Sequence, residues 1–187
     1  MPKPGQSATV TIRPATPTDA ADLARVQVDS YRSAYAGILP DAYLAQFSYE
    51  EQAQDWRDLL AAETGDLLLV AVDPNGEVMG YALGRRLIDE RYDCELAALH
   101  VRHDARGQGI GRASIAAVAD HFRRQGCRSL VVWTLAANRP ARSLYEGLGG
   151  QLNGQRQIEL SEATFFEEVA YGWPQLESLA GMQRFDE

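Results

Sequence analysis

A glycine-rich segment, Arg106-Gly107-Gln108-Gly109-Ile110-Gly111-Arg112, limits the folds open to this 187-residue chain more than any other feature. It lies between a stretch typical of a strand, 94–101, and one typical of a helix, 109–125. Glycines at alternate positions allow a tight turn and bring backbone N–H groups close to an anion. A helix that starts at the same place adds the positive end of its dipole. The segment therefore predicts a site for a ligand that carries phosphates.

The spacing of the glycines excludes two common kinds of phosphate site. A Rossmann dinucleotide loop that starts at Gly107 needs a third glycine where Arg112 stands, and a P-loop ends in Gly-Lys-Ser/Thr. The segment instead resembles the Arg/Gln-x-x-Gly-x-Gly/Ala signature of the GNAT superfamily of acetyltransferases. Arg106, Gly109 and Gly111 occupy its three defining positions.

Two flanking stretches extend this resemblance over roughly the whole chain. Residues 95–101, Glu-Leu-Ala-Ala-Leu-His-Val, resemble the fourth strand of the family, and 138–149 resemble its Asn…Tyr-Glu-x-Leu-Gly helix. The resemblance implies an N-acetyltransferase that uses acetyl-CoA as co-substrate. It implies direct attack of a primary amine on the thioester in a ternary complex.

Apolar periodicity and turn residues predict the order of the other elements. The expected strands are 9–13, 67–72, 78–85, 94–101, 130–135, 155–160 and 167–173, and the expected helices are 19–35, 41–62 with a break near 47–48, 109–125 and 140–148. A strand–helix–strand unit of this length requires a right-handed crossover and a parallel pair. The sum is a mixed α/β sheet of about seven strands with about four helices. The resemblance implies that these strands are mostly antiparallel and that the central parallel pair, the fourth and fifth strands, splays apart to admit coenzyme A.

Composition predicts one domain over 1–187, because 45% apolar and 24% charged residues are typical of a globular chain of this length. Residues 1–7 lack the apolar core of a signal peptide, so we expect a flexible N-terminus and a cytoplasmic protein. The tail, 174–187, has apolar residues at helical spacing and is expected to pack on the body or on a second subunit. Many members of the family are dimers, which makes a homodimer possible.

Net charge and cysteine content limit which ligands and partner molecules this chain is expected to bind. A formal net charge of −8 argues against nucleic acid and favours cationic small molecules, and no apolar run is long enough to span a membrane. Cys94 and Cys127 are spaced unlike a metal-binding knuckle, so no metal is expected, and nothing beside them in sequence supports a covalent acyl carrier.

The resemblance implies a set of coenzyme-binding residues. Leu99 and Val101 would bind the pantetheine arm through main-chain groups, since an open strand edge exposes unpaired N–H and C=O groups. Backbone N–H groups of 108–112 would bind the pyrophosphate, and Asn138 would hold either the pantetheine or the junction between strand and helix. The complete expected set is Leu99, His100, Val101, Arg106, Gly107, Gln108, Gly109, Ile110, Gly111, Arg112, Asn138 and Tyr145.

Two side chains are expected to carry the chemistry. An alkyl ammonium has a pKa near 10.4, so about 4 to 5 kcal/mol is needed to deprotonate it at pH 7, and a base is expected. Glu95 matches the position of the base in many members of the family. A water chain, His100 or His103 are the alternatives. Tyr145 matches the tyrosine that protonates the departing thiolate.

The acceptor side is expected at the first helices and the last hairpin. Tyr31, Tyr35, Phe165 and Phe166 would line an aromatic pocket. Negative charge would come from Asp89, Glu90, Asp93, Glu162, Glu167 and Glu168. A small amine-bearing molecule is the favoured acceptor. Alternatives are a protein N-terminus or lysine, a transferase of another acyl group, and a coenzyme A-binding module without turnover.

Overall fold

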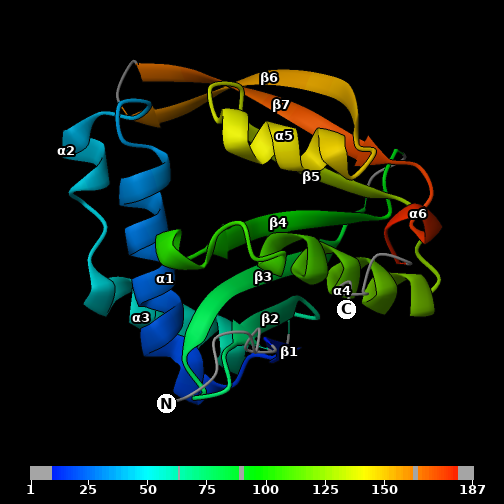
Figure 1. Cartoon of the computed structure of the whole chain (residues 1–187). Coiled ribbons are helices and arrows are strands. Elements are labelled where there is room, and N and C mark those ends of the chain that lie inside the picture. Colours follow the sequence, from blue (N-terminus) through cyan, green and yellow to red (C-terminus); the bar gives the residue numbers. More distant parts are fainter. Residues whose placement is uncertain (1–9, 63, 89–90, 162–163, 181–187) are drawn as a thin grey trace, which may run out of the picture.

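The computed structural model describes residues 10–62, 64–88, 91–161 and 164–180, and its strands form one mixed sheet (Figure 1). The strands are β1 (Thr11–Pro14), β2 (Leu67–Val72), β3 (Val78–Arg86), β4 (Cys94–Val101), β5 (Leu130–Leu135), β6 (Gln151–Ser161) and β7 (Thr164–Trp173). The helices are α1 (Ala20–Ala34), α2 (Asp41–Leu44), α3 (Tyr49–Ala61), α4 (Ile110–Arg124), α5 (Arg139–Gly147) and α6 (Glu177–Ala180). The expected break in the second helical stretch is present, and Ser48 caps α3 by accepting from the Glu51 N–H at 3.4 Å.

The sheet has the order β1-β2-β3-β4-β5-β7-β6, and β4–β5 is its parallel pair. That pairing is limited to Cys94 and Glu95 against Leu130 and Val131. In the described chain, the rest of β4 pairs with β3 alone and the rest of β5 with β7 alone. Figure 1 shows the two strands meeting at one end and diverging towards the other. The expected splayed parallel pair is confirmed.

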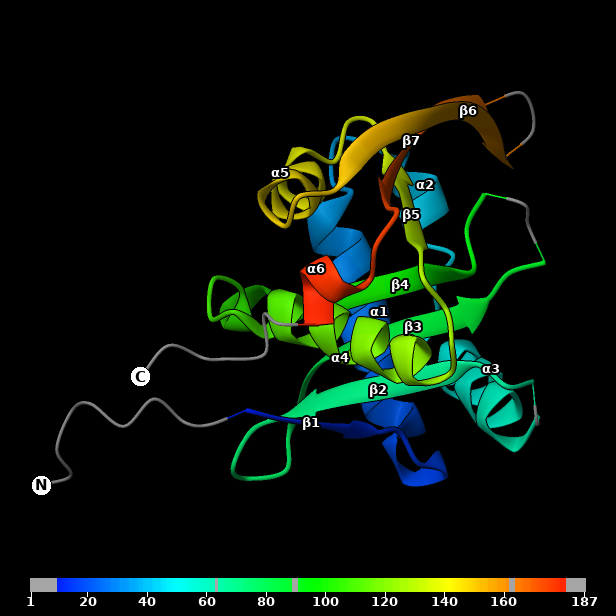
Figure 2. The ribbon, with the colours of Figure 1, turned by 90° about the vertical axis from the view of Figure 1, so that its right-hand side faces the viewer.

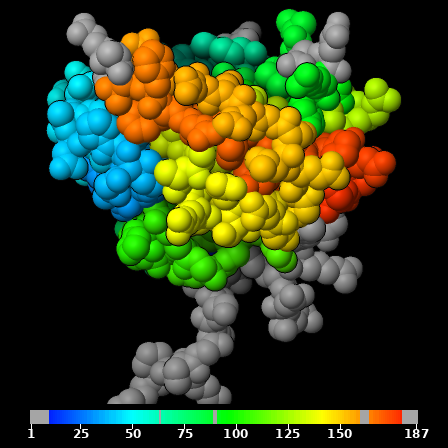
Figure 3. Space-filling model, turned by 90° about the horizontal axis from the view of Figure 1, so that it is seen from above, coloured from blue at the N-terminus to red at the C-terminus, as the bar shows by residue number. Residues whose placement is uncertain are grey.

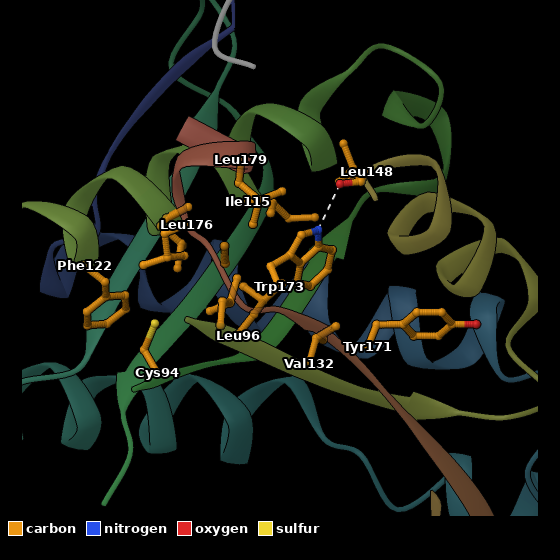
Figure 4. Close-up of a cluster of buried hydrophobic side chains, with 14 of the residues drawn as sticks. Cys94, Leu96, Ile115, Phe122, Val132, Leu148, Tyr171, Trp173, Leu176 and Leu179 are labelled. Carbon is orange, nitrogen blue, oxygen red and sulfur yellow. Dashed lines mark hydrogen bonds between the residues drawn. The ribbon is translucent and has the colours of Figure 1, made fainter. Parts of the chain in front are cut away.

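Helices cover both faces of the sheet (Figure 2). On one face α4, α5 and α6 bury a cluster that includes Leu96, Phe122 and Trp173, whose indole N–H donates to the Leu148 carbonyl at 2.9 Å (Figure 4). On the other face α1 and α3 bury a second cluster around Trp56 and Tyr81. The sheet therefore separates an α4–α5 side from an α1–α3 side.

The C-terminal tail packs on the body as far as the structure describes it. Leu176 and Leu179 are fully buried and join the core cluster beneath α4. The segment 1–7 and the end of the tail, 181–187, lie outside the described residues.

Asp19, one of the two expected N-caps, is the N-cap residue of α1, but its side chain accepts no hydrogen bond from the first turn of that helix. A turn of 3₁₀-helix, Pro17–Asp19, comes first, and the buried Asp19 carboxylate faces back towards β1. It accepts hydrogen bonds from Arg13 at 2.8 Å and from the Thr16 N–H at 2.7 Å. The Arg13 guanidinium is the main cause that lowers the pKa of Asp19 to about 2. The carboxylate thus ties the first strand to the first helix instead of capping it.

We expect Asp19→Asn to lower the free energy of unfolding by about 2 kcal/mol at pH 7, the equivalent of this pKa shift. Because the pKa is lower in the folded protein, the contribution is complete above about pH 4 and is lost as the pH falls through about 2. Urea unfolding at several pH values measures it. Asp22→Asn is the matched control, since Asp22 only pairs with Arg25 on the surface of α1. If Asp22→Asn lowered the free energy of unfolding as much as Asp19→Asn does, the stabilising role of the Asp19–Arg13 pair would be contradicted.

Candidate active site

One cleft opens where β4 and β5 diverge. Its volume is about 490 Å³, and its walls come from the end of α1, from β4, from the loop before α4 and from α5. Figure 3 shows the blue end of α1, the green segment around the start of α4 and the yellow α5 meeting on one face. Of the residues expected from the sequence, the lining includes Tyr35, Leu99, His100, Val101, Arg106, Gly107, Gly109, Ile110, Gly111, Arg112, Asn138 and Tyr145.

The cleft ends in a run of unbonded backbone N–H groups at the start of α4. Gly107 has φ +77°, and Gly109, the N-cap residue, has φ +79°. Within the described chain the N–H groups of 107–112 form no hydrogen bond, and the next one, of Ala113, donates to the Gly109 carbonyl at 3.0 Å. Free donors at a helix N-terminus bind anions. This donor set fits a diphosphate.

Two polar side chains hold the loop in shape. The Arg106 guanidinium donates to the Val101 carbonyl at 3.3 Å and to the Ser33 hydroxyl at 3.2 Å, so it joins the loop to β4 and α1. The Gln108 side chain donates to the Asp104 carbonyl at 3.3 Å and is not part of the cleft lining. The Gln108 side chain therefore bonds to the preceding turn and does not line the cleft.

Gly111 lies where the first turn of α4 faces the cleft. A Cβ at this position would lie 3.4 Å from Cδ2 of Leu144 on α5 and 3.8 Å from Cδ2 of Leu99 on β4. The lack of a side chain leaves the space between the two walls open at this point.

Tyr145 projects from α5 into the cleft and is 5% exposed. Burial raises the pKa of its phenol, and the nearby Tyr35 phenol adds to the rise, so the hydroxyl keeps its proton at neutral pH. The Asn138 side chain caps α5 by accepting from the Ala141 N–H at 3.3 Å, and its proximity to the Tyr35 hydroxyl partly offsets the rise that burial causes in the pKa of Tyr35. The end of α1 and the start of α5 thus meet in the cleft wall beside Tyr145.

Glu95 lies at the last position where β4 pairs with β5, beside Val131 of β5 and directly opposite Arg85 of β3. It is partly buried and has no hydrogen bond or ion pair within the described chain. It is not among the residues that line the cleft. Its neighbours Cys94 and Leu96 pack under α4, so alternation turns Glu95 to the α1–α3 side of the sheet.

His100 lines the cleft but is stacked between two tyrosines, with ring centroids 5.2 Å from Tyr31 and 5.1 Å from Tyr81. Burial, with a smaller effect of the Arg106 charge, lowers the pKa of His100 to about 4. A neutral imidazole with this pKa is a poor acceptor for an ammonium proton. His103 is exposed in the 3₁₀ turn after β4 and is not among the residues that line the cleft.

The expected aromatic residues of the acceptor side divide into two groups. Tyr31, Tyr35 and Phe166 join one apolar cluster, to which Tyr43 of α2 contributes. Phe165 is 59% exposed and lies on the opposite face of β7, because neighbouring strand residues alternate between faces. The structure does not bring Phe165 into the cluster.

Of the expected negative charges, three lie among the described residues, and two of these three are directed away from the cluster. Glu168 faces the cluster. The pKa of Tyr31 is raised to about 12, mainly because Tyr31 is buried, and the negative charge of Glu168 contributes to this rise. Glu167 hydrogen-bonds with Gln155 on the other face of β7, and Asp93 accepts from the backbone N–H of Arg128 at 2.6 Å. Asp89, Glu90 and Glu162 lie outside the described residues.

Several residues of this region had no sequence signal. Tyr43 lies in a four-residue helix without a usable period. Arg156 stacks 4.1 Å above the Trp133 ring and pairs with Glu168 at 2.7 Å, and only the β6–β7 register brings these three together. A pattern of long-range pairing is not readable from one sequence.

Comparison with known proteins agrees with the fold. The model of the acetyltransferase (GNAT) family matches residues 29–149. The uncharacterized N-acetyltransferase YuaI of Bacillus subtilis is 32% identical over 91% of this chain and 96% of its own. An aminoglycoside N(6')-acetyltransferase type 1 of Stenotrophomonas maltophilia is 36% identical over 64% of this chain and 72% of its own. The PaiA N-acetyltransferase of Thermoplasma acidophilum, solved with coenzyme A, superposes with a TM-score of 0.66 at 18% identity over 86% of this chain and 98% of its own.

The sheet opens between the parallel strands β4 and β5, and unbonded backbone N–H groups lie next to this opening at the start of α4. Together with the family match, these features define an acyltransferase of the class that uses acetyl-CoA as co-substrate. The chain belongs to the acetyltransferase (GNAT) family. Among the described residues, no group of three or more His, Cys, Asp or Glu side chains could hold a metal ion. None of the described helices has the length and apolar character needed to cross a membrane.

Proposed function

We propose that the protein is an N-acetyltransferase that transfers the acetyl group of acetyl-CoA to the primary amine of a small molecule. The observation that carries the proposal is the run of free N–H groups over 107–112 beside a cleft between diverging strands. When bound, acetyl-CoA supplies an activated acetyl thioester. Cytoplasmic location and a homodimer remain predictions.

The proposed roles of the side chains follow from the proton balance. A neutral amine forms the amide bond and loses one proton, while the departing thiolate gains one. Glu95 is the proposed acceptor of the amine proton, directly or through water, because it is an unpaired carboxylate at the point where β4 and β5 part. Tyr145 is the proposed donor, because burial keeps its phenol protonated inside the cleft.

Two observations support a small acceptor. The Tyr31–Tyr35–Phe166 cluster gives the acceptor side aromatic walls, and the charge of the nearby Glu168 is neutralised by Arg156. The names of relatives point the same way: an L-methionine sulfoximine/L-methionine sulfone acetyltransferase of Pseudomonas aeruginosa is 34% identical over 54% of this chain and 60% of its own.

Calorimetry with acetyl-CoA, followed by a thiol-release screen over amines, amino acids, aminoglycosides and peptides, tests the proposal. We expect saturable binding and thiol release that depends on a small amine. Binding without transfer to any amine would favour a coenzyme A-binding module. Transfer to peptides alone would favour a protein acetyltransferase.

We expect Tyr145→Phe to lower kcat by about three- to tenfold and to leave the Kd for acetyl-CoA unchanged. The effect is modest because a thiol pKa near 8.5 makes the thiolate a fair leaving group without help. Steady-state kinetics measure kcat, and calorimetry measures the Kd. Tyr171→Phe serves as the control, since the Tyr171 hydroxyl donates outside the cleft, to Glu146 at 2.5 Å. If Tyr145→Phe had the kcat of the wild type, Tyr145 would not be the acid that protonates the thiolate.

A further inference from the structure

The α1–α3 side of the sheet carries charged residues around the point where β4 and β5 part. Arg85 and Glu95 are directly opposite one another on β3 and β4, and Gly84, next to Arg85, faces Phe122 of α4 on the other side. Arg85 and Glu95 therefore share the α1–α3 side, at the end of the sheet where β3 ends and β4 begins (Figure 2). Arg156 and Glu168 lie on the same side across β5 and β7, where Glu168 faces the Tyr31 cluster.

Two of these four charged groups neutralise each other. Arg156 donates to one carboxylate oxygen of Glu168 through two nitrogens, at 2.8 and 2.7 Å, and stacks on Trp133. This pair is complete without a ligand.

The other two charged groups have no partner. Nε of Arg85 is the buried side-chain polar atom that lacks a hydrogen-bond partner within the described part of the chain. Arg85 and Glu95 lie on facing positions of adjacent strands, yet they form no ion pair with each other or with any described residue. An unsatisfied buried donor destabilises a folded protein, and a charged one more so, unless a bound group satisfies it.

We propose that Arg85 binds a carboxylate of the acceptor, so that the acceptor is an amine with a neighbouring carboxylate, as in an α-amino acid. This inference rests on the proposed function. The guanidinium takes the acceptor carboxylate, and the acceptor amine lies towards Glu95 and the mouth of the parted strands. One zwitterion then satisfies both unpaired groups.

The chemistry of arginine favours a carboxylate over a neutral group. The planar guanidinium presents parallel N–H donors that match the two oxygens of a carboxylate. A partly buried site strengthens such a pair, because little water screens it. An amine without the carboxylate would leave Nε of Arg85 unsatisfied in the complex.

Thiol-release kinetics with three sets of acceptors test the proposal: the α-amino acids, their amides, and the corresponding decarboxylated amines. The wild type, Arg85→Gln and Arg86→Gln are compared. Arg86 is the matched control, because it is the adjacent arginine but lies opposite Cys94 on the other side of β3, and it is exposed. Melting temperature and the Kd for acetyl-CoA check the fold of each variant.

We expect Arg85→Gln to lower kcat/KM for the preferred amino acid by at least about 30-fold, mainly through KM, as for the loss of a charge-assisted bidentate pair. The variant-to-wild-type ratio for amides and decarboxylated amines should stay within about threefold, as should every ratio for Arg86→Gln. The melting temperature of Arg85→Gln should not fall, because a charged unpartnered donor is replaced by a neutral amide, which costs less to leave unsatisfied.

Each other outcome has a defined meaning. An equal loss for all acceptors would show that Arg85 acts through Glu95 and overturn the proposal. The proposal would also be overturned if the wild type acetylated only amines without a carboxylate, or if Arg85→Gln left kcat/KM for amino acids unchanged. In both cases the proposed acetyltransferase function would still stand. Absence of acetyl-CoA binding would instead refute the proposed function itself.

Discussion

Replacing Gly109 with alanine is expected to raise the Kd for acetyl-CoA by about 100-fold. Gly109 has φ +79°, a conformation that costs a residue with a Cβ about 1–2 kcal/mol. Relief of this strain rotates the N–H groups of 107–112 away from a common point. Loss of two hydrogen bonds to a charged diphosphate, each about 1.5 kcal/mol, accounts for the expected factor. Calorimetry with acetyl-CoA measures it.

A second glycine in the same conformation provides the control. Gly76 has φ +86° in the turn between β2 and β3, and an added Cβ there meets no atom within 4 Å. Gly76→Ala should lower the melting temperature to a similar extent and leave the Kd unchanged. If Gly109→Ala binds acetyl-CoA as tightly as Gly76→Ala does, the 107–112 amides are not the diphosphate site.

Local sequence patterns predicted the parts of this fold that neighbouring residues determine. The Asp73–Glu77 turn is one such part: the Asp73 carboxylate accepts from the N–H groups of Asn75 and Glu77 at 2.9 and 2.8 Å, so the hairpin is encoded within five residues. The boundaries of β6 were harder to predict from the sequence. It begins at Gln151, directly after Gly150, because β7 extends the pairing in both directions and absorbs two irregularities in register.

Long-range pairing determined what the sequence did not predict about the site. The insertion of β7 between β5 and β6 sets which residues meet, and it places Glu168 near Tyr31. The register between β3 and β4 shifts at Leu83/Gly84, and only after that shift does Arg85 lie opposite Glu95. Neither event leaves a local signal. The opposite faces of Phe165 and Phe166, by contrast, follow from strand alternation alone.

Glu95→Gln is expected to lower kcat at pH 7 by about 100-fold, in the range for loss of a general base. The amide keeps the size of the side chain but accepts no proton. The variant must therefore use the fraction of acceptor that is already neutral. For an alkyl amine with a pKa near 10.4, this fraction rises about tenfold per pH unit between 7 and 9. The gap between variant and wild type should narrow over that range.

Binding measurements separate this effect from a structural one. Glu95 does not line the cleft, so the Kd for acetyl-CoA should be the same in Glu95→Gln and in the wild type. Glu167→Gln is the control, because Glu167 lies on the face of β7 that is turned away from the Tyr31 cluster. If Glu95→Gln had the kcat of the wild type at pH 7, the base would be a water chain or His103 and not Glu95. A deficit that does not change between pH 7 and 9 would show that Glu95 orients the acceptor and does not take its proton.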